Sequence, residues 1–175
     1  MSLLRNLILT TVAVALAGCG FHLRGSGESS QLPFRAMYVE GGSPVAEQLK
    51  RHVRLSPGTR LTDTPAEAEA VIAIESDNSE KVIRSLSAAG KVLEYELRHS
   101  VSYSLRGPGG MSLLPVADIQ SKRYLTYSDA ELYGKGAEEE LLIKDMRNDL
   151  AQQIVRRIAL FRPTAQQQSS QLPAR

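Results

Sequence analysis

The sequence predicts an α+β fold in which two helices pack on one face of a four-stranded sheet, forming a two-layer sandwich. Three patterns support this fold: apolar and polar residues alternate from Leu93 to Arg106, one apolar stripe runs along residues 137–161, and a capped helix starts after Ser43. The expected element order is β-α-β-β-β-α, which makes the sheet mixed but largely antiparallel. Because both helices cover the same face, the opposite face must meet water or a partner.

The first two elements are a short strand and a helix. Residues 34–41 are rich in β-forming side chains. Ser43 offers a side-chain oxygen to the helix N-terminus, and Pro44 suits the first helical position. The helix presents one apolar stripe of residues spaced four apart, namely Val45, Leu49 and Val53.

A β-hairpin supplies the next two strands. Residues 70–76 are typical of a strand that continues through residues 82–86, with a bend near Asn78, and residues 88–91 form the turn. The alternation after this turn is the clearest pattern in the chain. Its inward positions are Leu93, Tyr95, Leu97, His99, Val101, Tyr103 and Leu105. A period of two residues is typical of a strand with one buried face and one wet face.

The last strand and a long helix complete the sandwich. Residues 107–110, GPGG, predict a turn, and residues 119–127 fit a fourth strand less cleanly. The helix is expected over residues 137–161. Steps of three and four residues place its apolar side chains on one face. They are Ile143, Met146, Leu150, Ile154, Ile158 and Phe161.

The N-terminus has the features of a lipoprotein signal peptide. Arg5 is the only charge in the first eighteen residues, and residues 7–17 form an apolar run too short to span a bilayer. Residues 16–19, LAGC, resemble the bacterial lipobox, which implies diacylglycerol on the Cys19 sulfur, cleavage before it and acylation of the new N-terminus. Several acyl chains would anchor the mature chain firmly to a membrane. Because Gly20 is not the Asp of the common retention signal, the expected location is the periplasmic side of the outer membrane.

Four segments result: a signal peptide over residues 1–18, a lipidated N-terminus and tether over 19–33, one α+β domain over 34–161, and a disordered tail over 162–175. The mature chain would hold 157 residues, with 20 Lys and Arg against 19 Asp and Glu. This near neutrality weighs against nucleic-acid binding. Lipidation would consume the only cysteine, which leaves no disulfide or thiol chemistry.

The sequence carries no recognisable catalytic, metal or cofactor motif. Its three histidines, His22, His52 and His99, follow no metal-ligand spacing, and His99 is expected to be hydrogen-bonded in the core or at a sheet edge. The acids at residues 138–140 are expected to be a solvated helix start. No phosphate-binding loop or serine-nucleophile motif occurs. The chain is therefore interpreted as a binding or assembly protein.

Basic residues are the best candidates for ligand binding. Arg84 and Lys91 flank the hairpin turn, with Lys81 nearby, and Lys135 lies in a Gly-Lys-Gly loop expected before the long helix. Cations presented at one end of a sheet can hold anionic head groups through charge-assisted hydrogen bonds. An ordinary mixed-charge surface is the alternative.

Three stretches resemble the LptE family of lipopolysaccharide-assembly lipoproteins. They are CGFHLR at residues 19–24, GKVLEYEL at residues 90–97 and LLIKDMRNDLAQQIVRRI at residues 141–158. The resemblance implies an outer-membrane lipoprotein that plugs the β-barrel LptD and supports its assembly. It also implies binding of lipopolysaccharide during delivery to the outer leaflet, with no enzymatic activity.

The resemblance further implies which cations bind lipopolysaccharide. A basic residue in the loop before the long helix contributes in the family, and Lys135 occupies that position. A second basic position, in the hairpin, falls near Ala88 in this chain. This departure leaves Arg84 or Lys91 as substitutes.

Two other functions compete with the barrel plug. One is an accessory lipoprotein of a different outer-membrane machine, for β-barrel assembly or for secretion. The other is a lipid-tethered periplasmic enzyme, which the missing catalytic motif disfavours.

Overall fold

The structure, a computed structural model, describes residues 31–127 and 132–162. In chain order these residues form β1, α2, β2, a 3₁₀ turn, β3, β4, a second 3₁₀ turn, β5 and α3. The expected signal peptide, Cys19 and the tether up to residue 30 lie outside the described residues, as does the expected tail beyond residue 162.

The sheet contains five strands in the order β2-β1-β3-β4-β5. Their bounds are Ala36–Glu40 for β1, Arg60–Leu61 for β2, Ala70–Leu86 for β3, Val92–Arg106 for β4 and Ser112–Thr126 for β5. β1 pairs in parallel with β2 and β3, whereas β3, β4 and β5 form an antiparallel ribbon. The predicted mixed, largely antiparallel α+β sandwich is confirmed. The extra strand, β2, escaped prediction because two residues carry no detectable periodicity.

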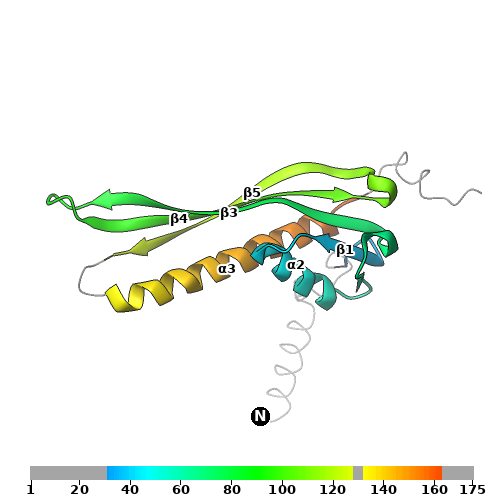
Figure 1. Cartoon of the computed structure of the whole chain (residues 1–175), viewed down its shortest axis with the longest axis horizontal. Helices are drawn as coiled ribbons and strands as arrows, with labels where there is room; N and C mark the ends of the chain where they lie inside the picture. Colours follow the sequence, from blue (N-terminus) through cyan, green and yellow to red (C-terminus); the bar gives the residue numbers. More distant parts are fainter. Residues whose placement is uncertain (1–30, 128–131, 163–175) are drawn as a thin grey trace, which may run out of the picture. The chain divides into compact units, whose positions relative to one another are not determined.

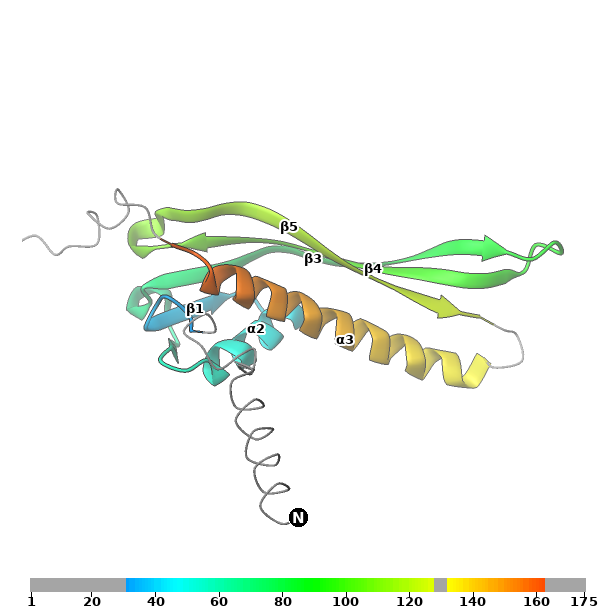
Figure 2. The same ribbon diagram turned by 180° about the vertical axis from the view of Figure 1, so that it is seen from behind.

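Two helices, α2 (Pro44–Leu55) and α3 (Leu132–Ala159), lie on the same side of the sheet, as Figure 1 and Figure 2 show. Ser43 caps α2 as expected, since its hydroxyl oxygen accepts a hydrogen bond from the Ala46 N–H at 3.2 Å. α3 runs along the antiparallel ribbon, and α2 lies beside β1. The other face of the ribbon has no helix over it among the described residues.

The core fills the space between the helices and the covered face. The apolar stripe predicted on α3 is confirmed, because all its members are at least partly buried: Ile143, Met146, Leu150, Ile154, Ile158 and Phe161. A smaller cluster of Leu97, Leu125 and Met146 lies under the ribbon on the side of the β3–β4 turn. Leu32, at the end of the expected tether, also belongs to the core.

Two strands differ from the sequence-based expectation. β5 begins at Ser112 rather than at residue 119, because an edge strand tolerates Pro115. The first half of β5 lacks clean alternation, so the sequence pattern did not reveal it. β3 is continuous, and its register with β4 shifts between Ile74 and Ser76 and again on both sides of Ser85, rather than at Asn78. A bulge leaves one residue unpaired, and single-sequence periodicity does not locate it.

The long helix starts earlier than predicted. α3 begins at Leu132, so Lys135 lies in its first turn rather than in a preceding loop. Gly134 and Gly136 suggested a loop, but each glycine costs a helix only about 1 kcal/mol relative to alanine. An ion pair between Lys135 and Glu138, one turn apart with 2.8 Å between Nζ and Oε2, favours the helical conformation.

A buried polar cluster joins the two layers. The Asp77 carboxylate accepts a hydrogen bond from the Val45 N–H at the start of α2, over 3.1 Å. Its other oxygen lies 2.7 Å from Nε2 of His99, and the His99 Nδ1 lies 2.5 Å from the Ser79 hydroxyl. The side chain of His99 is 2% exposed and that of Asp77 is 8% exposed. The prediction that His99 is a hydrogen-bonded core residue is confirmed.

The surroundings of Asp77 keep its carboxylate ionised. Burial alone would raise its pKa, but hydrogen bonds from His99, from the Ser43 hydroxyl and from the Val45 N–H lower the pKa from 3.8 to about 2. The N-terminal end of α2 also favours a negative charge there. The ionised group therefore holds α2 against β3 and β4.

The fold predicts how stability depends on pH at Asp77. Asp77→Asn should lower the free energy of unfolding by about 1–3 kcal/mol at neutral pH, because a buried charged acceptor is lost. Since the native pKa of about 2 lies below the usual 3.8, this contribution is full above the usual value and disappears as the pH falls through the native one. Urea unfolding of the wild type and of Asp77→Asn at several pH values across this range measures the difference in their free energies of unfolding.

Asp145→Asn, at an exposed position of α3, is the control for a changed carboxylate. A gap between wild type and Asp77→Asn that stays constant down to the most acidic pH tested would contradict the assignment.

Candidate functional site

The three cations singled out in the sequence lie at the same end of the sheet. Arg84 is near the end of β3, Lys91 is in the β3–β4 turn, and Lys135 is in the first turn of α3. The end of β5 reaches the same place, because Thr126 pairs with Glu94 of β4. We call this region the turn end of the sheet.

Arg84 lies on the face that no helix covers. Its guanidinium carbon is 4.0 Å from the centroid of the Tyr124 ring, a cation–π contact. Its Nη1 donates a hydrogen bond to Oε2 of Glu94 over 3.0 Å. The side chain is 46% exposed, so a ligand can reach it, but a carboxylate already occupies part of its donor set.

Lys135 reaches the ends of β4 and β5 from α3. Its ammonium lies 3.4 Å from the Thr126 hydroxyl and 2.8 Å from Oε2 of Glu138. Because Thr126 and Glu94 are cross-strand partners, Lys135 and Arg84 approach neighbouring positions of the turn end. The structure thus brings these two predicted cations into one neighbourhood.

Lys91 closes the tight turn between β3 and β4. Its carbonyl accepts a hydrogen bond from the Ser87 N–H at 2.7 Å, and its own N–H donates to the Ser87 hydroxyl at 3.1 Å. Gly90 has φ of 77°, a conformation that favours glycine. Ala88, where the family carries a basic residue according to the resemblance, is exposed in this turn. The turn therefore presents Lys91 as its cation.

Lys81, which the sequence places near Arg84 and Lys91, also lies at this end of the sheet. Its ammonium lies 4.3 Å from the centroid of the Tyr95 ring and 2.6 Å from Oε2 of Glu139. These contacts tie β3 to α3. Alternation along β3 places Lys81 on the helix side, but only the register with α3 reveals its partner.

The uncovered face continues from the turn end as a lattice of charged pairs. Arg98 Nε lies 2.6 Å from Oε1 of Glu96, and Lys122 Nζ lies 3.8 Å from the same oxygen. The hydrogen bond from Arg98, followed by its charge and that of Lys122, lowers the pKa of the Glu96 carboxyl despite some desolvation. The same hydrogen bond raises the pKa of the Arg98 guanidinium, so Glu96 and Arg98 stay a charged pair around neutral pH.

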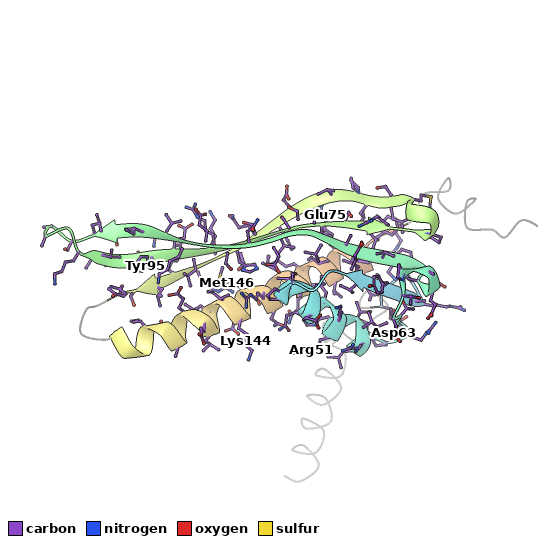
Figure 3. All side chains as sticks on the ribbon, in the orientation of Figure 1. Arg51, Asp63, Glu75, Tyr95, Lys144 and Met146 are labelled. Carbon is purple, nitrogen blue, oxygen red and sulfur yellow. The ribbon has the colours of Figure 1, made fainter. Side chains whose placement is uncertain are left out.

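Short hydroxyl and amide side chains fill the middle of the uncovered face. They hydrogen-bond across the strands, in the pairs Ser76–Ser102, Ser102–Asp118 and Gln120–Ser100. Farther along, the Ser104 hydroxyl donates to Glu75, and Arg106 pairs with Glu40. Figure 3 places Glu75 on the side of the sheet away from the helices and Met146 on the helix side. The uncovered face is thus mainly polar, with the half-exposed Tyr124 ring beneath Arg84 as an aromatic exception.

Comparison with known proteins identifies the family. The profile described as LptE, lipopolysaccharide-assembly, matches residues 32–158, which is well over half of the chain. This chain belongs to the LptE family. The predicted resemblance is therefore confirmed over nearly all of the α+β domain.

Two relatives named LPS-assembly lipoprotein LptE align with this chain over most of their length. The LPS-assembly lipoprotein LptE of Photorhabdus laumondii is 28% identical over 158 residues, covering 87% of this chain and 84% of that protein. The protein of the same name from Pectobacterium atrosepticum is 25% identical and covers 87% and 83%.

Solved structures share the LptE fold. The solution NMR structure of lipoprotein B from Nitrosomonas europaea matches with a TM-score of 0.71 at 35% identity, covering 81% of this chain and 92% of that one. The crystal structure of rare lipoprotein B from Shewanella oneidensis matches with a TM-score of 0.61 at 24% identity, covering 71% and 93%.

Two features are missing from the described residues of this LptE family member. Within residues 31–127 and 132–162, no three His, Cys, Asp or Glu side chains gather as a metal-binding group. No helix in the same ranges combines the length and the apolar character needed to cross a membrane.

Proposed function

We propose that this LptE family member is an outer-membrane lipoprotein, anchored through acylated Cys19 on the periplasmic side, that plugs the LptD barrel and supports its assembly. The observation that carries the proposal is the uncovered sheet face, which is mainly polar and has no second layer over it among the described residues. The lumen of a large outer-membrane barrel is itself polar and hydrated. A face built from Ser, Gln and paired charges suits such surroundings better than an apolar interface.

We also propose that the turn end contributes to lipopolysaccharide binding. Lys135, Arg84 and Lys91 present an ammonium or guanidinium group at one end of the sheet, where phosphates can accept charge-assisted hydrogen bonds. Lys135 has Glu138 as a carboxylate neighbour, and Arg84 has Glu94. An incoming phosphate would compete with these acids for the cations. Because salt screens the attraction between exposed charges, binding should weaken as the salt concentration rises.

Outer-membrane extraction tests the plug. The wild-type chain should be recovered in a stable complex with a large β-barrel protein, identified as LptD by mass spectrometry. The Cys19→Ser variant should fold but lose its fixation to the membrane, because the acceptor sulfur is absent. Recovery of the wild type alone, or with a different outer-membrane machine, would reject the plug.

A charge reversal at Lys135 tests lipopolysaccharide binding. Lys135→Asp should lower the affinity for lipopolysaccharide about tenfold, since an attraction to phosphate becomes a repulsion. Displacement of labelled lipopolysaccharide measures this affinity. Adding the double change Arg84→Ala and Lys91→Ala should lower the affinity further.

Lys50→Asp is the matched control, because Lys50 also pairs one turn away on a helix, with Glu47 at 2.7 Å, but lies on α2. Equal affinity for wild type and Lys135→Asp, or equal losses for Lys135→Asp and Lys50→Asp, would remove Lys135 from the site.

A further inference from the structure

Both helices end in the same short pattern, an arginine followed by a leucine one turn later. Residues 51–55, RHVRL, close α2, and residues 156–160, RRIAL, close α3. Each of these arginines and leucines comes two residues after a fully buried residue of its helix. Because two residues correspond to roughly 200° of helix rotation, their side chains point away from the core. Figure 3 shows Arg51 on the side of α2 away from the sheet.

The last turns of the two helices carry only positive charge. Residues 50–56 and 152–162 contain no Asp or Glu and six basic residues, namely Lys50, Arg51, Arg54, Arg156, Arg157 and Arg162. The nearest acid on α2, Glu47, pairs with Lys50 at 2.7 Å, and Arg156 donates to the neutral Gln152 at 3.3 Å. In the loop after α2, Glu67 pairs with Arg60 at 3.8 Å. The exposed arginines therefore keep donor groups for an anionic ligand.

The two leucines of the pattern are unusually exposed. Leu55 is 74% exposed and Leu160 is 67% exposed, the highest values among the large apolar side chains that the structure describes. A single exposed leucine is ordinary on a protein surface. Two of them among basic groups form a surface that suits the headgroup region of an anionic bilayer, where the phosphates attract cations and the acyl boundary accepts apolar side chains.

Phe34 joins the two helix ends. Its ring stacks on that of Phe161, just after α3, with 6.1 Å between the ring centroids. Its carbonyl accepts a hydrogen bond at 2.9 Å from the hydroxyl of Thr59, just after α2. Figure 1 and Figure 2 accordingly place both helix ends beside β1. We call Arg51, Arg54, Leu55, Arg156 and Leu160 the helix-end surface.

The chain enters the domain at this end. Leu32 is buried in the core, and thirteen residues separate it from Cys19. An extended chain of that length spans at most about 45 Å. The turn end lies about 50 Å away along β4, which has 15 residues that rise about 3.3 Å each. A lipid on Cys19 would therefore hold the helix-end surface, rather than the turn end, near the bilayer.

We propose that the helix-end surface docks on the headgroup region of an anionic bilayer. Arg51, Arg54 and Arg156 donate charge-assisted hydrogen bonds to lipid phosphates, and Leu55 and Leu160 lie at the acyl boundary. The contact is weak alone and adds to the acyl chains of Cys19, on whose proposed lipidation this cooperation rests. The uncovered sheet face points the other way and stays available to a barrel.

A single tryptophan tests the contact, because the chain has none of its own. In the mature chain carrying Cys19→Ser, the emission of Leu160→Trp should move to shorter wavelength with phosphatidylcholine vesicles that contain phosphatidylglycerol, and not with phosphatidylcholine alone. Leu141→Trp is the matched control, since Leu141 is 58% exposed on the same helix. It lies about 28 Å from Leu160 along the helix axis, so its emission should not change.

A charge reversal gives a second readout. Arg156→Glu should raise the dissociation constant for the phosphatidylglycerol vesicles about tenfold, because an attraction to the lipid phosphates becomes a repulsion. Lys122→Glu makes the same change of charge on the uncovered face and should leave the constant unchanged. Equal losses for the two variants would show attraction by net charge alone and overturn the proposal.

The position of the tryptophan decides between surfaces. No shift from Leu160→Trp, or an equal shift with phosphatidylcholine alone, would overturn the proposal. An equal shift from Leu141→Trp, or a larger one from Leu86→Trp at the turn end, would overturn it in favour of another surface. Because these chains lack acyl groups, a failure here leaves the Cys19 anchor and the barrel plug to their own tests.

Discussion

The burial of one sheet face under two helices is the constraint on which the other features depend. α3 supplies a continuous apolar stripe, and the alternate residues of β4 from Leu97 to Leu105 are buried on the same face, whereas Leu93, near the start of the strand, is 48% exposed. The buried polar group at the centre of this layer must then be satisfied internally, which Asp77 achieves by binding His99 and the start of α2. The opposite residues of β4 are left to form a polar face, and they hydrogen-bond to one another across the strands.

This division of the sheet also explains where the cations gather. The antiparallel ribbon continues beyond Ala73, where the pairing of β3 with β1 ends. Its turn end carries charges on both faces. Arg84 binds Glu94 on the uncovered face, whereas Lys81 binds Glu139 of α3 on the other. Each cation is oriented by an acid, so a phosphate would meet preoriented donors but would have to compete for them.

Much of this fold could be predicted from the sequence because its periodic segments are long. The alternation around His99 and the stripe from Ile143 to Phe161 fixed the two main layers correctly. Prediction failed where tertiary context decides: β5 extends through Pro115 because it is an edge strand, and α3 begins before Gly134. For the site, the clustering of Arg84 and Lys135 required the pairing of Glu94 with Thr126, a register that sequence alone does not provide.

The most direct test concerns the surroundings of the polar sheet face in the membrane. Gln120 lies on that face, where its amide donates to the Ser100 hydroxyl over 2.9 Å. A photo-crosslinking residue at position 120 of the membrane-resident chain should form a covalent adduct with the barrel protein LptD. A correctly folded, membrane-bound chain that forms no adduct from this position would contradict the assignment of the polar face to a barrel lumen.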